Sequence, residues 1–109
     1  MTLQPLLQIA RGDAEFPNWK RTAGGCAGDN GYDDLRLNAG VTLYAANGDV
    51  AGSGFITDAT VAGSKCILTG TVDDVTPAKF FKVQFANRNK VAFSMEQLQE
   101  QSAYLTIGQ

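Results

Sequence analysis

Histidine is absent from this sequence of 109 residues, and cysteine occurs only twice. Without histidine the chain has no Ser-His-Asp or Cys-His arrangement, and mixed zinc sites lose their usual nitrogen ligand. Two adjacent acidic pairs, Asp33–Asp34 and Asp73–Asp74, remain as candidates for carboxylate catalysis. Such pairs at strand ends are usually solvated, and no glycine-rich stretch is framed as a phosphate-binding loop requires. We therefore expect a protein that is not an enzyme.

The sequence also lacks an excess of charge of one sign and a long apolar run. Nine basic and eleven acidic residues give a formal net charge of −2, which provides no general attraction to a phosphate backbone. We expect no nucleic acid partner. No stretch approaches the roughly eighteen apolar residues of a membrane helix, so we expect no membrane span in this chain. Its start has no basic region followed by an apolar stretch, so we expect any targeting segment to have been removed.

The composition that is present favours one small β domain. Hydrophobic residues make up 44% of the chain and charged residues 18%, which is typical of a globular protein. Twelve glycines disfavour long helices. A length of 109 residues fits a single domain, which we place at 1–109.

Alternation of apolar and polar residues predicts a series of strands. We expect them at about 2–10, 41–45, 50–57, 66–72, 79–85, 90–93 and 103–107. Pro5 would make the first an edge strand or bend it. Asn47–Gly48 predicts a hairpin because both turn positions favour positive φ. Ser94 and Gln97 form a capping box that predicts a short helix over about 95–101. The expected fold is mostly β, a small antiparallel sandwich or partly open barrel of about seven strands with one short helix near the C-terminus.

One predicted hairpin turns at Asn87-Arg88-Asn89. Apolar residues alternate on both of its strands, so we expect one face of it to be buried. The side chains expected on that face are Phe81, Val83, Phe85, Val91 and Phe93.

The segment 13–37 shows no periodicity and is expected to be a long irregular loop. It contains Phe16, Trp19 and Tyr32. Exposed rings on such a loop would anchor a partner, whereas a loop that folds back would bury them as part of a small core. We expect the contact surface to combine this loop with the turn at 87–89, and Trp19, Tyr32 and Arg88 are the candidate partner-binding residues.

Cys26 and Cys66 do not belong to a Cys-x-x-Cys pair. From the residues alone, two such cysteines are either a disulfide or two unrelated buried thiols. Both interpretations remain open at this point.

Acidic residues gather at Asp29, Asp33 and Asp34. A tight loop of carboxylates, amides and carbonyls offers the oxygen ligands that calcium prefers, although the downstream glutamate of an EF-hand is missing. The alternative is that these side chains cap a turn by bonding to backbone amides. No other cofactor is indicated.

Several motifs together resemble a known family. They are Cys26-x-Gly28-x-x-Gly31-Tyr32-Asp33-Asp34-Leu35, Gly40-Val41-Thr42-Leu43, Cys66, Pro77 with Phe80-Phe81, and Val91-Ala92-Phe93-Ser94. Over about residues 2–108 the chain resembles the extracellular domain of uncharacterised actinobacterial lipoproteins and single-span membrane proteins. It departs from them where Asp29-Asn30 replaces a shorter glycine link and where Leu35 replaces isoleucine.

The resemblance implies a disulfide between Cys26 and Cys66, and a location outside the cell or at its surface, with a lipid or transmembrane anchor upstream. The function we expect is a non-catalytic binding or accessory module of the cell envelope whose partner is a protein or a cell-wall component. The alternatives are a calcium-stabilised structural module, and a small secreted or phage-encoded inhibitor that presents the loop 13–37.

Overall fold

The computed structural model describes residues 7–76, 78–99 and 103–107. Within them, nine strands and one short helix follow one another along the chain. The strands are β1 (Leu7–Glu15), β2 (Trp19–Thr22), β3 (Gly25–Gly28), β4 (Gly40–Ala45), β5 (Val50–Ala62), β6 (Lys65–Val75), β7 (Phe80–Phe85), β8 (Val91–Ser94) and β9 (Ala103–Thr106), and the helix is α1 (Met95–Gln99). The part of the first expected strand before Leu7, including Pro5, lies outside the described residues.

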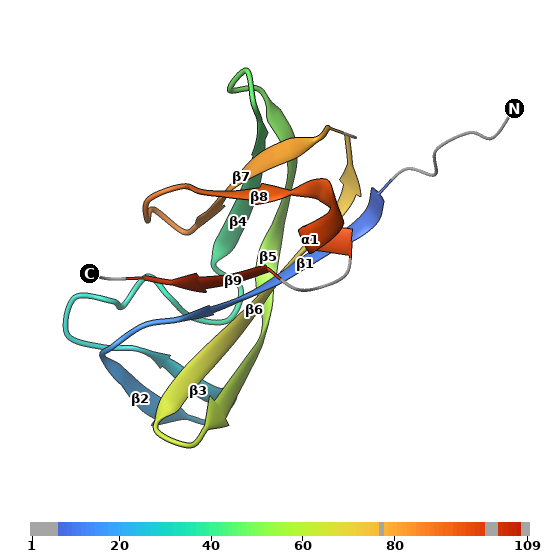
Figure 1. The fold of residues 1–109 in the computed structure, drawn as a ribbon. Coiled ribbons are helices and arrows are strands. Elements are labelled where there is room, and N and C mark those ends of the chain that lie inside the picture. The colour runs from blue at the N-terminus through green and yellow to red at the C-terminus, as the bar shows by residue number, and fades with distance from the viewer. Residues whose placement is uncertain (1–6, 77, 100–102, 108–109) are drawn as a thin grey trace, which may run out of the picture.

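Seven of the strands form one sheet in the order β8-β7-β4-β5-β6-β1-β9, which curls into a nearly closed barrel (Figure 1). The predicted fold class, mostly β with one short helix near the C-terminus, is confirmed. The expectation of an entirely antiparallel sheet is wrong for one pair, because β9 runs parallel to β1. The cause is α1, which carries the chain from β8 to the opposite border of the sheet, so that β9 returns beside β1 and not beside β8.

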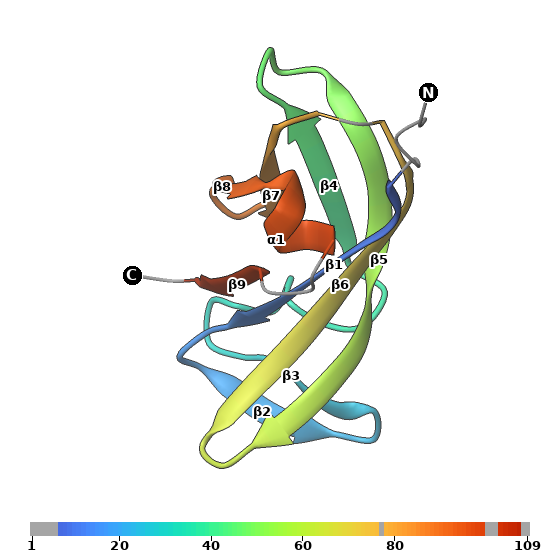
Figure 2. The ribbon, with the colours of Figure 1, turned by 45° about the vertical axis from the view of Figure 1, so that its right-hand side comes forward.

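Hairpin β5–β6 is the longest element, with strands of 13 and 11 residues. Its outer half extends beyond the barrel and supports the short ribbon β2–β3 (Figure 2). The disulfide between Cys26 of β3 and Cys66 of β6 joins the ribbon to this hairpin, with 6.0 Å between the two Cα atoms. The disulfide implied by the family resemblance is therefore confirmed.

The segment 13–37 is more ordered than expected. Its first residues belong to β1, and it contains both strands of the ribbon, so the prediction of a wholly irregular loop is wrong. The alternation of apolar and polar residues did not reveal strand β3, for a physical reason. Strand β3 has the sequence Gly-Cys-Ala-Gly, in which two of four positions carry no side chain to display alternation.

The hairpin predicted at Asn47–Gly48 joins β4 to β5. Only Gly48 takes a positive φ, of 96°, so the expectation for both positions holds for the glycine alone. The side chain of Asn47 stabilises the turn instead, since its Oδ1 accepts a hydrogen bond from the backbone N–H of Asp49 at 3.0 Å.

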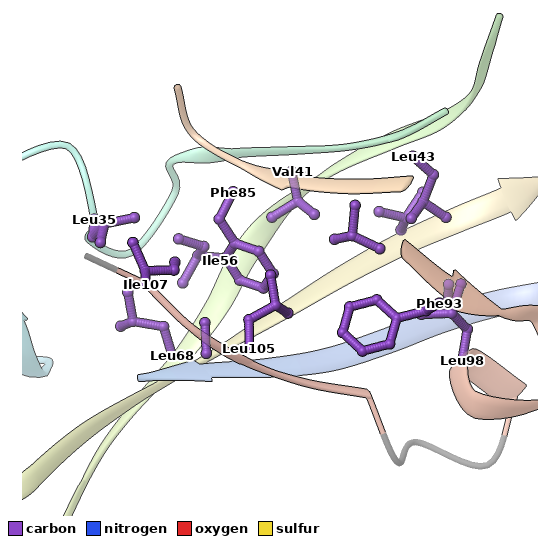
Figure 3. Packing of buried hydrophobic residues seen from close by; sticks show 14 of the residues in the cluster. Leu35, Val41, Leu43, Ile56, Leu68, Phe85, Phe93, Leu98, Leu105 and Ile107 are labelled. Carbon is purple, nitrogen blue, oxygen red and sulfur yellow. The ribbon is translucent and has the colours of Figure 1, made fainter. Parts of the chain in front are cut away.

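The interior of the barrel is filled by apolar side chains. Figure 3 shows Leu35 and Ile107 at one end of this core and Phe93 and Leu98 at the other. A cavity of about 10 Å³ lies among these side chains, about the volume of one water-sized sphere. Of the five residues expected on the buried face of the β7–β8 hairpin, four are buried, but Val91 is 36% exposed. Val91 is the first residue of β8, and among the described strands only β7 pairs with β8.

The capping box at the start of α1 is confirmed. The backbone N–H of Ser94 donates to Oε1 of Gln97 at 2.9 Å, and the N–H of Gln97 donates to Oγ of Ser94 at 3.2 Å. Leu98 anchors the helix to the core, and residues 100–101 of the predicted helix lie outside the described part. Among the residues that the structure describes, no helix has the length and hydropathy needed to cross a membrane.

Candidate binding groove at the barrel seam

The barrel has a seam, because β8 and β9 are the two terminal strands of the sheet and do not pair with each other. Each has a single neighbour among the described strands, β7 for β8 and β1 for β9. Helix α1 lies at one end of the seam, where it follows β8 and packs against β1 (Figure 2). The other end of the seam, where β8 begins and β9 finishes, is not covered by the helix.

The direction of the backbone groups along the seam follows from two hydrogen bonds. An extended strand points the N–H and C=O of one residue to one side and those of the next residue to the other. The N–H of Ile107 donates to the carbonyl of Glu15 at 2.9 Å, so alternate residues of β9 face β1. Tyr104 and Thr106, which lie between them, therefore direct their backbone groups into the seam.

The direction of the backbone groups of β8 follows from a hydrogen bond made by the end of β7. The N–H of Ala86 donates to the carbonyl of Gly40 on the β4 side at 2.7 Å, so Phe85 and the residues alternating with it face β8. Phe81 and Val83 thus bond Phe93 and Val91, which are their register partners. Ala92 and Ser94 are consequently the residues of β8 whose backbone groups face the seam.

A groove of about 490 Å³ opens at the uncovered end of the seam. We call it the seam groove. Its volume lies within the range of small ligand sites, roughly 300–1,000 Å³. Side chains from three separate parts of the chain line it: Tyr32, then Asn87, Arg88, Asn89 and Val91, then Thr106 and Ile107.

Arg88 holds the turn at 87–89 against the loop that carries Tyr32. Its Nε and Nη2 donate to the two carboxylate oxygens of Asp34 at 3.1 and 2.5 Å, and Nη2 also donates to the carbonyl of Gly31 at 2.7 Å. The guanidinium lies over the ring of Tyr32, 4.6 Å from its centroid. A forked pair of this kind fixes orientation as well as charge. The turn at 87–89 and the loop that carries Tyr32 are thereby positioned as one wall.

The loop behind Tyr32 is shaped by local backbone chemistry. Asn30 and Gly31 take positive φ values of 48° and 98°, which turn the chain sharply. The N–H of Gly28 then donates to the carbonyl of Leu35 at 2.7 Å, which closes the loop. A Cβ at Gly28 would overlap the carbonyl oxygen of Tyr32, so only glycine permits this closure.

The structure does not gather the three acidic residues considered for calcium. Asp34 is paired with Arg88, and Asp33 is exposed. In the described part of the chain, no group of three or more His, Cys, Asp or Glu residues is arranged to hold a metal ion. The calcium site considered for Asp29, Asp33 and Asp34 stays a prediction.

The three residues expected to bind a partner are divided between two places. Tyr32 and Arg88 lie together in the seam groove. Trp19 lies apart from them in the ribbon, half-buried, where its Nε1–H donates to the carbonyl of Ser64 at 3.1 Å. Phe16 is buried in the core and packs beside Tyr32, with 6.0 Å between the ring centroids. The aromatic residues of segment 13–37 therefore do not form one exposed cluster.

No family model, curated protein or solved structure matches this chain. The resemblance to the extracellular domains of actinobacterial lipoproteins stays a prediction.

Beside the groove, Tyr104 of β9 forms a second polar cluster on the outer face. Its hydroxyl donates to Oε2 of Glu15 at 2.5 Å, and the same oxygen lies 2.9 Å from Nζ of Lys65. The hydrogen bond to Glu15 raises the pKa of Tyr104 to about 12. Lys65 and then Tyr104 lower the pKa of Glu15 from its usual value. This cluster fixes the side chain of Tyr104 on the outer face of β9, outside the seam groove.

Sequence reasoning did not find Val91, Thr106 and Ile107 as groove residues. Alternation correctly assigns Ile107 to the inner face, but alternation gives no information about which strands are neighbours. The one sequence feature that could have indicated Val91 as a groove residue is its position at the start of a short strand, directly after the turn that carries Arg88.

Proposed function

We propose that this chain is a non-catalytic binding module of the cell envelope, displayed outside the membrane, and that the seam groove is its binding site. The observation that carries the proposal is the groove itself. It joins the loop containing Tyr32 to the turn containing Arg88, two regions 56 positions apart by residue number.

The groups in the groove suit recognition. Within the described residues the side-chain amides of Asn87 and Asn89 have no hydrogen-bond partner, and both side chains are exposed. Amides of this kind both donate and accept hydrogen bonds to a ligand. The ring of Tyr32 and the side chain of Val91 add apolar contact area. Arg88 is held by Asp34 and positions the wall of the groove.

The disulfide supports the proposed location. Structural disulfides form and persist in oxidising compartments, which include the space outside the membrane. Cys26 and Cys66 are both buried, so the bond is protected from exchange with external thiols.

The test is a map of binding on the protein. Isotope-labelled protein is titrated with fractions of an actinobacterial cell-envelope extract, and amide resonances are followed. We expect shifts at residues 87–91, 106–107 and the loop around Tyr32. The double variant Asn87→Ala with Asn89→Ala should weaken binding by about 1–3 kcal/mol. The matched control is Asn47→Ala at the opposite hairpin, which should bind as the wild type does. Shifts confined to the ribbon β2–β3, or equal binding by both variants, would contradict the proposal.

A further inference from the structure

We propose that the ligand of the seam groove is an extended polypeptide segment of a partner protein, which adds as a strand to the edge of β9. This inference rests on the proposed function, because it names the class of molecule that the groove binds. It follows from the backbone groups along the seam and not from a side-chain motif.

The edge of β9 offers a ladder that only an extended peptide matches in full. Tyr104 and Thr106 direct their N–H and C=O groups away from β1, since Ile107 bonds Glu15 on the other side. The two residues are two positions apart, which in a strand is roughly 6.6 Å. Alternate residues of a bound strand present complementary C=O and N–H groups at this same spacing.

The position of the groove determines where the peptide enters. At the α1 end of the seam, the N–H of Ser94 already donates to Gln97. At the other end, Val91 is partly exposed, and Thr106 and Ile107 line the groove. A segment entering there lies beside β9, with Ala92 of β8 on the far side of the seam. A second copy of the chain would present only the edge of a folded sheet and would not enter between two walls.

The charges of the groove are already balanced. Arg88 forms both of its forked hydrogen bonds with Asp34, so the cation is neutralised within the protein. The amides of Asn87 and Asn89 are neutral. We therefore expect an uncharged or mixed segment to bind, with apolar side chains against Tyr32 and Val91, and with little dependence on salt.

The experiment uses two variants at one position of the edge. Thr106→Pro removes an N–H that faces the seam and that β1 does not use, and proline is tolerated in edge strands. Thr106→Val removes the same hydroxyl but keeps the N–H. The probe is the strongest binder selected on the wild-type protein from a displayed library of random linear peptides, synthesised afterwards. We expect Thr106→Val to bind it normally and Thr106→Pro to bind it more weakly by on the order of tenfold.

A second measurement does not depend on the folding of either variant. The probe peptide is resynthesised with N-methyl groups at one backbone position at a time. Strand addition makes every second N-methyl group disruptive and leaves those between them tolerated. Melting temperature confirms that both Thr106 variants are folded.

The outcomes separate the two proposals. If the N-methyl series shows no alternation and Thr106→Pro binds normally, while the Asn87/Asn89 variant still loses binding, strand addition is wrong and the groove remains the site. If the Asn87/Asn89 variant also binds the probe normally, both are wrong. A library that yields no binder overturns strand addition. A wild-type dimer that Thr106→Pro dissociates also overturns it, because the edge of β9 would then bind a second copy of the chain.

Discussion

The Cys26–Cys66 disulfide should supply a large share of the stability of this domain. The two residues are 40 positions apart, and closing a loop of that length in the unfolded chain is worth about 4 kcal/mol on the chain-entropy model. Domains of this size have a total free energy of unfolding of roughly 5–15 kcal/mol. The double variant Cys26→Ala with Cys66→Ala should therefore lie close to the limit of folding at physiological temperature.

The location of the disulfide predicts that the ribbon β2–β3 unfolds first in the double variant. Without it, the ribbon β2–β3 is held mainly by the Trp19–Ser64 hydrogen bond, at 3.1 Å, and by backbone contacts to hairpin β5–β6. Trp19 is the only tryptophan, so its fluorescence reports on the ribbon, while far-ultraviolet circular dichroism reports on the barrel. In urea we expect the fluorescence transition of the variant to precede the circular dichroism transition.

The control is the wild-type protein, whose two transitions should coincide. Intact mass after alkylation under denaturing conditions, without reductant, should show no modified thiol in that protein. A loss of less than about 1 kcal/mol in the double variant would refute the reasoning, because chain entropy alone requires several times more.

Two further predictions concern single positions. Gly28→Ala should lower the free energy of unfolding by about 3 kcal/mol, because the added Cβ would overlap the Tyr32 carbonyl. The control is Gly40→Ala, whose Cβ would face open space and should change the free energy of unfolding by about 0.5 kcal/mol or less. Urea denaturation measures both variants, and equal effects would contradict the close approach of Gly28 to Tyr32. The folded-state pKa of Tyr104 is raised, to about 12, so the stability that its bond to Glu15 provides is present below the usual tyrosine pKa of 10 and is lost as the pH rises toward 12. Ultraviolet absorbance titration should show this late ionisation in the wild type and not in Tyr104→Phe, and a midpoint for that tyrosine near 10 would show that the bond is not formed.

Local features of the fold were predictable from the sequence. The strands from Val41 onward follow from alternation, and the cap of the helix follows from Ser94 and Gln97, because these signals depend on residues close together in the chain. The ribbon was missed because its glycines carry no pattern. The parallel placement of β9 was missed because it depends on where α1 delivers the chain.

The candidate site was predictable in part. Tyr32 and Arg88 were expected to face a partner, and the structure brings them to one groove. Trp19 was grouped with them because it is close to Tyr32 in the sequence, but its indole N–H bonds to Ser64 and Trp19 is not among the residues that line the groove. The exposure of Val91 has a similar origin. Its inward direction is a local property, whereas the absence of a strand over it depends on the order of the whole sheet, which alternation does not encode.

Amide hydrogen exchange along β9 tests the central claim, that the barrel is open at this seam and offers unpaired backbone groups there. We expect slow exchange at Leu105 and Ile107, whose N–H groups face β1, and fast exchange at Tyr104 and Thr106, whose N–H groups face the seam. Nuclear magnetic resonance resolves each amide in the protein without ligand. Slow exchange at Thr106 would mean that the seam is already closed by a pairing, and would contradict both the groove and the strand that we propose to enter it.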